Sequence, residues 1–212
     1  MSDSVASVAA LAQRILAAAP PDRRCLIAIA GAPASGKSTL ADALCGHLTG
    51  LGHASAVVPM DGFHLDNRLL ESRGLVPRKG APETFDLGGL HRLVAALHSG
   101  DEVIYPLFDR TRDLSVAAAG HVGADTRLVL VEGNYLLFDE PGWRDLAPLW
   151  DITVRVHVPA DELRRRLVAR WRDHGLSAQA ALARAEDNDL PNAERVNGAA
   201  LAADIDYQGE TQ

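Results

Sequence analysis

Cysteine and lysine are both scarce in this chain. Its 212 residues include only two cysteines, Cys25 and Cys45, and neither has a partner at metal-ligand spacing. We therefore expect two reduced thiols near the core, with no disulfide framework and no zinc site. Among the 21 basic residues, only Lys37 and Lys79 are lysines. Because lysine is so scarce, Lys37, which follows Gly36 in a glycine-rich turn, stands out as a candidate functional residue.

Long apolar runs and an excess of positive charge are missing as well. No stretch approaches the roughly 20 apolar residues of a membrane span. Residues 1–22 lack the basic start of a signal peptide, and Gln13 and Arg14 interrupt their apolar pattern, so we expect an amphipathic helix. The formal net charge of -7 argues against a nucleic-acid surface, which is usually basic. We expect a soluble, cytoplasmic protein with neither nucleic acid nor membrane as partner.

Apolar strand candidates alternate with helical patterns along the chain. This order predicts an α/β fold with a parallel sheet covered by helices on both faces. The length and the 47% hydrophobic content suit a single domain over residues 1–212. Strands are expected at 25–30, 55–60, 127–132, 151–158 and 203–207, with a short one in 102–110. Helices are expected after Gly36, Asp86 and Ala160 and over 177–189, and loops over 61–85 and 117–125.

A glycine-rich turn joins the strand at 25–30 to the next helix. Residues 31–38 satisfy the pattern G-x-x-x-x-G-K-[ST]. Glycines let the backbone curl around phosphate oxygens, and the helix that follows offers free N–H groups and its positive dipole end. Lys37 can then reach the β- and γ-phosphates, and the Ser38 hydroxyl can bind Mg²⁺. The turn predicts a P-loop that binds a nucleoside triphosphate through Gly31, Ala34, Ser35, Gly36, Lys37, Ser38 and Thr39.

Two carboxylates are expected beside this phosphate site. Asp61 follows one strand and Glu132 ends another, so both fall at the carboxyl edge of the sheet, where open α/β sheets bind ligands. One carboxylate could accept the proton of an alcohol while the other orients metal and water. A turn or helix cap for Asp61, and a structural hydrogen bond for Glu132, are the alternatives. A GTPase is excluded because neither lysine lies in an Asn/Thr-Lys-x-Asp motif.

Five segments resemble one kinase family. They are GAPASGKST, MDGFHLDN, RKGAPETFD, VEGNYLL and DELRRRLVARWRDHG, in this order. Together they resemble the phosphoribulokinase / uridine kinase / pantothenate kinase family over about residues 24–207, and most of all its bacterial branch labelled fructose transport system kinase or nucleoside/nucleotide kinase-like. The resemblance implies a P-loop fold like that of nucleoside monophosphate kinases, with a five-stranded parallel sheet. It also implies ATP, Mg²⁺ and a small acceptor with a hydroxyl group.

The resemblance assigns roles to matching residues. Asp61 matches the catalytic base, Lys37 and Ser38 the phosphate and metal groups, and Glu132 the acidic residue that acts through metal-bound water. Residues 61–86, called the flap below, then lie beside the acceptor. Their candidates for acceptor binding are Arg78, Lys79 and Asp86. The arginine-lysine-glycine sequence is similar to pantothenate kinases, but this chain lacks their long N-terminal extension, which puts pantothenate in doubt as the substrate.

An arginine-rich helix is expected over residues 160–176. Five arginines crowd it, at positions 164, 165, 166, 170 and 172, and such a lid can close over the triphosphate. A guanidinium can stabilise charge on the transferring phosphoryl group, and Arg166 and Arg170, four residues apart on one face, are the candidates. The alternative is a solvated basic face paired with Asp161, Glu162 and Asp173.

Further polar and aromatic residues could form the acceptor pocket. His64 follows Asp61 by three residues, although packing or capping would also explain it. The segment 105–110 offers Tyr105, Phe108, Asp109 and Arg110 as an acceptor wall, unless Asp109 and Arg110 simply pair with each other. Asn188 or Asn192 could bind acceptor hydroxyls, with helix-end capping around Pro191 as the alternative.

These patterns predict a kinase that transfers the γ-phosphate of ATP to a hydroxyl of a small metabolite, a sugar such as fructose. A nucleoside or pantothenate-like kinase is one alternative. A regulatory ATPase acting on a partner protein is another, and a nucleotide-binding module without turnover is the third. The oligomeric state stays open, with a homodimer among the alternatives.

Overall fold

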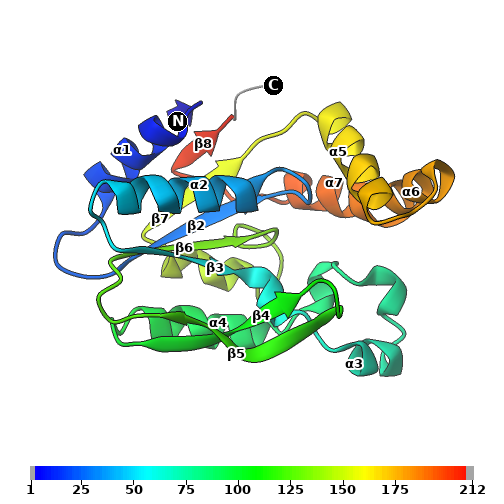
Figure 1. The fold of residues 1–212 in the computed structure, drawn as a ribbon, viewed down its shortest axis with the longest axis horizontal. Coiled ribbons are helices and arrows are strands. Elements are labelled where there is room, and N and C mark those ends of the chain that lie inside the picture. The colour runs from blue at the N-terminus through cyan, green and yellow to red at the C-terminus, as the bar shows by residue number, and fades with distance from the viewer. Residues whose placement is uncertain (1–2, 209–212) are drawn as a thin grey trace.

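A six-stranded parallel sheet forms the centre of the molecule in the computed structural model, which describes residues 3–208 (Figure 1). The strand order is β1-β8-β7-β2-β6-β3. Every residue of β2 is buried, because helices cover both faces of the sheet. The strands are β1 (Asp3–Val5), β2 (Cys25–Gly31), β3 (Ser55–Pro59), β6 (Leu128–Gly133), β7 (Ile152–Val156) and β8 (Ile205–Tyr207).

Two separate cores lie on the two faces of the sheet. On one face α1 (Val8–Ala18) and α2 (Lys37–Gly50) pack against β2 side chains such as Ile27 and Ile29. On the other face α4 (Leu87–Leu97) packs against the alternate β2 residues, among them Leu26. Figure 1 shows α1 and α2 above the sheet and α4 below it. The alternating direction of strand side chains thus supplies both cores from a single strand.

The sheet has one strand more than the five predicted. The five predicted strands are present, with bounds that differ by at most two residues. The sixth is β1, so the prediction of one helix over residues 1–22 is wrong for its first part. Val5 pairs with Tyr207 of β8, and Ser7 then caps α1 by accepting a hydrogen bond from the Ala10 N–H at 3.3 Å. A three-residue strand is too short to show periodicity, and its pairing with a strand distant in sequence forms it.

A hairpin of β4 (Val103–Asp109) and β5 (Leu114–Val122) packs beside α4. The loop predicted over 117–125 is therefore largely wrong. Its alanines show no polar–apolar alternation, and pairing with β4 imposes the strand. The ladder is interrupted opposite Pro106, since Tyr105 pairs with Gly120 but Leu107 pairs with Val116. Proline has no N–H to donate, which explains a bulge at this point.

The predicted loop at 61–85 is mostly a series of short turns. It contains η1 (Met60–Phe63), α3 (Asn67–Ser72), η2 (Val76–Arg78) and η3 (Pro82–Thr84). Prolines start the last two turns, where a missing N–H costs nothing. Local hydrogen bonds, such as Thr84 Oγ1 to the Ala81 carbonyl at 2.7 Å, give this flap a fixed shape.

Three helices project at the right of Figure 1. They are α5 (Ala160–Asp173), α6 (Ala178–Arg184) and α7 (Leu190–Gly198), and the π-helical turn η5 (Ala185–Asp189) joins the last two. The helix predicted to end at Asp189 therefore continues, because Pro191 lies in the first turn of α7, which it tolerates. Within residues 3–208, none of the helices is both long and apolar enough to cross a bilayer.

Candidate active site

The turn between β2 and α2 has the geometry of a phosphate cradle. Gly36 precedes α2 at φ 85°, and Ala34 at φ 61° also adopts the left-handed region. A Cβ on Gly31 would lie 2.6 Å from Ser35 Oγ and 3.2 Å from the Val156 main-chain oxygen, so a larger residue would be crowded at the end of β2. No described side chain caps α2. The N–H groups of its first turn are thus available to an anion.

Charged groups from three elements meet at this cradle. Glu132 ends β6 opposite Pro59 of β3, and this register brings Asp61, two residues further along, to the same edge. Burial lowers the pKa of Lys37, whereas Glu132 and Asp61 act to raise it. Burial raises the pKa of Glu132, while Lys37 and a hydrogen bond from Ser38 lower it. The buried ammonium and carboxylate stabilise each other's charge.

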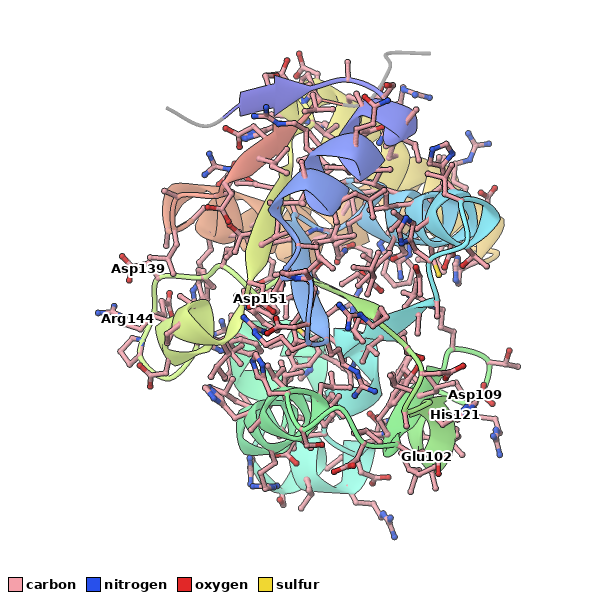
Figure 2. The ribbon with its side chains drawn as sticks, turned by 90° about the vertical axis from the view of Figure 1, so that its left-hand side faces the viewer. Glu102, Asp109, His121, Asp139, Arg144 and Asp151 are labelled. Atoms are coloured by element: carbon pink, nitrogen blue, oxygen red, sulfur yellow. The ribbon has the colours of Figure 1, made fainter. Side chains whose placement is uncertain are left out.

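Asp61 has a partner that the sequence analysis missed. Arg110 Nη2 lies 2.9 Å from Asp61 Oδ2, although the Arg110 side chain is 54% exposed. The suggested pair of Asp109 with Arg110 is wrong, because Asp109 accepts hydrogen bonds from the Arg112 N–H and Nε at 2.9 and 2.7 Å. Figure 2 shows Asp109 on the β4–β5 hairpin, at the lower right. Arg110 was a candidate for the acceptor wall, but no sequence pattern indicated its pair with Asp61, which lies 49 residues earlier in the chain.

A cavity of about 920 Å³ lies between the P-loop, the flap, the hairpin and the α5–α7 helices. It brings together many of the predicted site residues, which are Ala34, Gly36, Lys37, Ser38, Thr39, Asp61, His64, Lys79, Arg166 and Arg170. Gly31, Ser35 and Glu132 are not among its lining residues, and Ser35 lines a second cavity described below. Phe108, Arg110 and Asn192, which were also named as possible acceptor contacts, line the cavity too. Asn134, Trp171 and Asp189 line it without having been predicted.

Five predicted acceptor residues are not part of the cavity wall. Tyr105 is buried in the core, where its hydroxyl donates to the Val57 carbonyl at 3.0 Å. Asp86 caps α4 by accepting from the Gly89 N–H at 2.8 Å. Both side chains therefore serve the fold, Tyr105 through its burial in the core and Asp86 as a helix cap.

The other three lie at its margin. Arg78 pairs with Glu83 at 2.6 Å, and Asp109 is held by Arg112. Asn188 lies in the π-helical turn, and Asn192, one helical turn later and 8% exposed, lines the cavity. Both asparagines were candidates, and only Asn192 is among the residues that line the cavity.

Lys79 is tied to the hairpin. Its Nζ lies 2.7 Å from Asn67 Oδ1 and 2.8 Å from Asp113 Oδ1, and it sits 5.2 Å from the ring centre of Phe108. Its charge is therefore compensated within the protein. Asn134 Oδ1 on the cavity wall is in contrast buried and has no hydrogen-bond partner among the described residues.

The arginines of α5 divide into two groups. Arg164 pairs with Glu186, and Arg165 with Glu162 at 2.7 Å. Arg166 also contacts Glu162, yet its Nη1 donates to the Ser35 carbonyl of the P-loop at 3.3 Å. Arg170 lies partly buried on the cavity wall. Its burial, and to a lesser extent the positive charge of Arg110, lower the pKa of its guanidinium. The α5 helix thus places two guanidinium groups over the P-loop side of the cavity.

A second cavity, of about 980 Å³, opens on the other side of the P-loop. It is bounded by residues 6–8, the first turns of α2, residues 156–159, α5 and the end of β8. Gly36, Thr39 and Arg166 line both cavities. The phosphate cradle is therefore the place where the two spaces meet.

A family model described as the phosphoribulokinase / uridine kinase family matches residues 26–195. The chain belongs to this family. The predicted family, P-loop fold and kinase activity are thereby confirmed: the protein is an ATP-dependent phosphotransferase with an alcohol group as acceptor.

Three relatives show the range of the likeness. A provisionally named fructose transport system kinase from Silicibacter sp. TM1040 has 55% identity and a TM-score of 0.93, covering 95% of this chain and 99% of its own. The Escherichia coli K12 protein YggC, described as uncharacterized, is 41% identical over 83% of this chain and 74% of its own. A provisionally named uridine kinase from Schizosaccharomyces pombe is 33% identical over 88% of this chain and 83% of its own.

Proposed function

We propose that this kinase transfers the γ-phosphate of ATP to a hydroxyl of a sugar such as fructose. The observation that carries the proposal is the meeting of two cavities at the P-loop. A nucleoside can occupy the cavity beside β8, and an acceptor the cavity under the flap. The triphosphate then lies along the cradle, and the transferred group faces Asp61.

Lys37 and the N–H groups of the first α2 turn hold the phosphates. The Ser38 hydroxyl and the Glu132 carboxylate supply the oxygen ligands that Mg²⁺ prefers. Bound Mg²⁺ would neutralise charge on the phosphates. Arg166 and Arg170 add two fixed positive charges above the transferring group, and α5 acts as the lid.

Asp61 is the general base in this proposal. Its carboxylate is half-buried on the cavity wall and takes the proton of the attacking hydroxyl. Arg110 fixes the position of that carboxylate. The attack then needs only an acceptor hydroxyl between Asp61 and the cradle.

The choice of a sugar rests on the similarity to a protein named as a fructose transport system kinase and on the polar cavity wall. A nucleoside or a pantothenate-like acceptor, and a regulatory ATPase acting on a partner protein, are the competing functions. We place the whole chain in one domain, 1–212, in the cytoplasm, where ATP and Mg²⁺ are available and Cys25 and Cys45 stay reduced.

ADP formation with and without a panel of sugars, nucleosides and pantothenate tests the proposal. We expect a rate that a sugar stimulates and that Lys37→Ala abolishes, while the melting temperature stays near that of the wild type. Hydrolysis that no acceptor stimulates would favour the regulatory ATPase. Strong turnover of uridine or pantothenate, with none of any sugar, would reassign the acceptor.

A further inference from the structure

The His64 ring is clamped in the wall of the acceptor cavity. Its centroid lies 4.1 Å from that of Phe85 and 4.5 Å from that of Phe108. Phe85 belongs to the flap and Phe108 to β4, so two elements fix the plane of the ring. Rotation of the side chain away from the cavity would break both contacts.

One hydrogen bond sets the tautomer of this histidine. Its Nδ1 lies 2.8 Å from the main-chain carbonyl oxygen of Asp61. A carbonyl oxygen only accepts, so Nδ1 carries the hydrogen and donates it. Burial lowers the pKa of the ring, which keeps it neutral at physiological pH. Nε2 consequently has a free lone pair and no hydrogen.

That lone pair is open to a ligand. His64 lines the same cavity as Asp61, and Nε2 has no hydrogen-bond partner among the described residues. Among the described side chains, the fully buried polar atoms without a partner are Ser35 Oγ and Asn134 Oδ1. His64 Nε2 also has no partner among them but is not one of these two atoms, so it is not fully buried. Nε2 is therefore reachable from the cavity, next to the residue proposed as the base.

The flap and hairpin side of the cavity carries balanced charge. Its charged side chains are Asp61, Lys79, Arg110 and Asp113. Arg110 pairs with Asp61 at 2.9 Å and Lys79 with Asp113 at 2.8 Å. On this side of the cavity, Lys79 and Arg110 are already paired with carboxylates. A carboxylate or phosphate on the acceptor would therefore lie near two carboxylates and a nitrogen lone pair.

Building on the proposed kinase function, we infer that His64 is a specificity-determining residue that accepts a hydrogen bond from a second hydroxyl of the acceptor. The acceptor is an uncharged polyol, not an acid or a sugar phosphate. A lone pair at Nε2 accepts a hydrogen bond from an O–H group and repels an ether or carboxylate oxygen.

Matched acceptors test the charge. The pairs are D-glucitol with D-gluconate and D-arabinitol with D-arabinonate, each differing by one carboxylate, with D-fructose and its monodeoxy analogues as a second series. We expect kcat/KM to be higher for the neutral member by roughly tenfold or more, and one deoxy position besides the phosphorylated one to lose a similar factor. Acids that match or exceed the polyols would overturn the inference.

Two variants separate recognition from structure. His64→Asn can still donate to the Asp61 carbonyl but lacks a group at the Nε2 position, whereas His64→Gln places an amide oxygen near that position. We expect His64→Asn to raise KM for the polyol by roughly tenfold or more, with a much smaller change in kcat and no further loss on the sensitive deoxy analogue. His64→Gln should recover part of the affinity, and His91→Asn, altering a histidine of α4, should change neither constant.

The outcomes also separate this inference from the proposed function. Unchanged KM in His64→Asn, or a deoxy penalty that persists in it, would contradict the role of Nε2. ATP hydrolysis that no acceptor stimulates would instead contradict the kinase function. In that case, or if the variants do not fold, calorimetry decides the polyol preference. It measures the binding of the same acceptor pairs to wild-type protein loaded with a non-hydrolysable ATP analogue.

Discussion

The Asp61 side chain is held by one contact that matters for its chemistry, the 2.9 Å pair with Arg110. Asp61→Asn keeps the shape and removes the ability to take a proton. We expect phosphoryl transfer to fall by about 10² to 10⁴, the usual range for general-base assistance. Nucleotide binding should persist, since Lys37, Ser38 and the backbone hold the triphosphate. Acceptor phosphorylation over a Mg²⁺ titration, beside nucleotide calorimetry, measures both.

Each alternative role of Asp61 gives a different result. If Asp61 only capped a turn, Asp61→Asn would lower stability by about 1 kcal/mol or less and leave turnover nearly unchanged. A metal ligand would let excess Mg²⁺ restore the rate. Asp109→Asn is the matched control, because that carboxylate lies nearby on β4 but pairs with Arg112. Wild-type turnover in Asp61→Asn, or its full rescue by Mg²⁺, would remove Asp61 from the role of base.

The Cys25 thiol should be inert in the folded protein. Burial in β2 raises its pKa to about 12, so only about 10⁻⁴ of it is thiolate at pH 8. Burial also raises the pKa of Cys45, which is more exposed. We expect iodoacetamide at pH 8 to label Cys45 before Cys25 in the native protein, and both after unfolding. Mass spectrometry of the labelled peptides decides this, and equal native rates would contradict it.

Site residues were predictable where chemistry fixes the local sequence. The P-loop pattern and the carboxylates at strand ends follow from spacing alone, so Lys37 and Asp61 could be predicted to lie together, and both line the cavity. The pair of Arg110 with Asp61 was missed, because it depends on how the hairpin packs. Trp171 and Asp189 were missed as wall residues, because their place depends on how α5 and the π-helical turn pack. Asp86 was misjudged for the opposite reason, since its polar character serves a helix cap.

Arg24 joins several elements at once. Its guanidinium is part of a side chain only 4% exposed and donates to five main-chain carbonyls. The acceptors are Leu97 of α4, Gly100, Asp101, Gly123 and Thr126. This one residue thus satisfies the end of α4 and the turns before β4 and β6.

Loss of Arg24 should be costly. We expect Arg24→Ala to lower the free energy of unfolding by about 3 kcal/mol or more, because buried carbonyls lose their donors. Arg24→Lys, with three donors in place of five, should be intermediate. Arg23→Ala is the control, since its pair with Asp151 is half-exposed and worth about 1 kcal/mol or less. Urea denaturation of the three variants measures the free energy of unfolding. A loss in Arg24→Ala no larger than the loss in Arg23→Ala would contradict the prediction.

Elements with a long, regular pattern were predictable, and those made by distant pairing were not. β2 is apolar throughout and β6 is apolar up to Glu132, and α4 has a clear apolar face after its Asp86 cap. β1 exists because β8 pairs with it, and β5 because β4 does. No property of the alanines at 117–119 distinguishes them from a loop before that pairing.

Surface ion pairs add little to these elements individually. Asp139 and Arg144, at the left of Figure 2, lie 3.2 Å apart, with both side chains about half-exposed. Such pairs contribute about 0–1 kcal/mol. The stability of the molecule comes instead from the two apolar cores on either face of the sheet.

At the scale of the whole molecule, nucleotide binding should raise the melting temperature. A ligand that binds only the folded protein stabilises it by about 2.7 kcal/mol at a hundredfold excess over Kd. For a chain of this length that corresponds to roughly 5 to 10 °C. We expect this shift with Mg-ATP and a smaller one with Mg-GTP, because the chain has no guanine motif. Differential scanning fluorimetry checks it, and an equal or larger shift with GTP would contradict the preference for adenine.

The two cavities that share Gly36, Thr39 and Arg166 have a consequence for inhibitor chemistry. A single molecule that joins adenosine to a polyol through a chain of phosphates would occupy both spaces at once. Once one end is bound, the other is present at an effective concentration in the millimolar range, provided the chain spans the cradle. Such a bisubstrate compound should therefore bind far more tightly than either half. The number of phosphates that gives the tightest binding would measure, in solution, the distance between the two substrates at the moment of transfer.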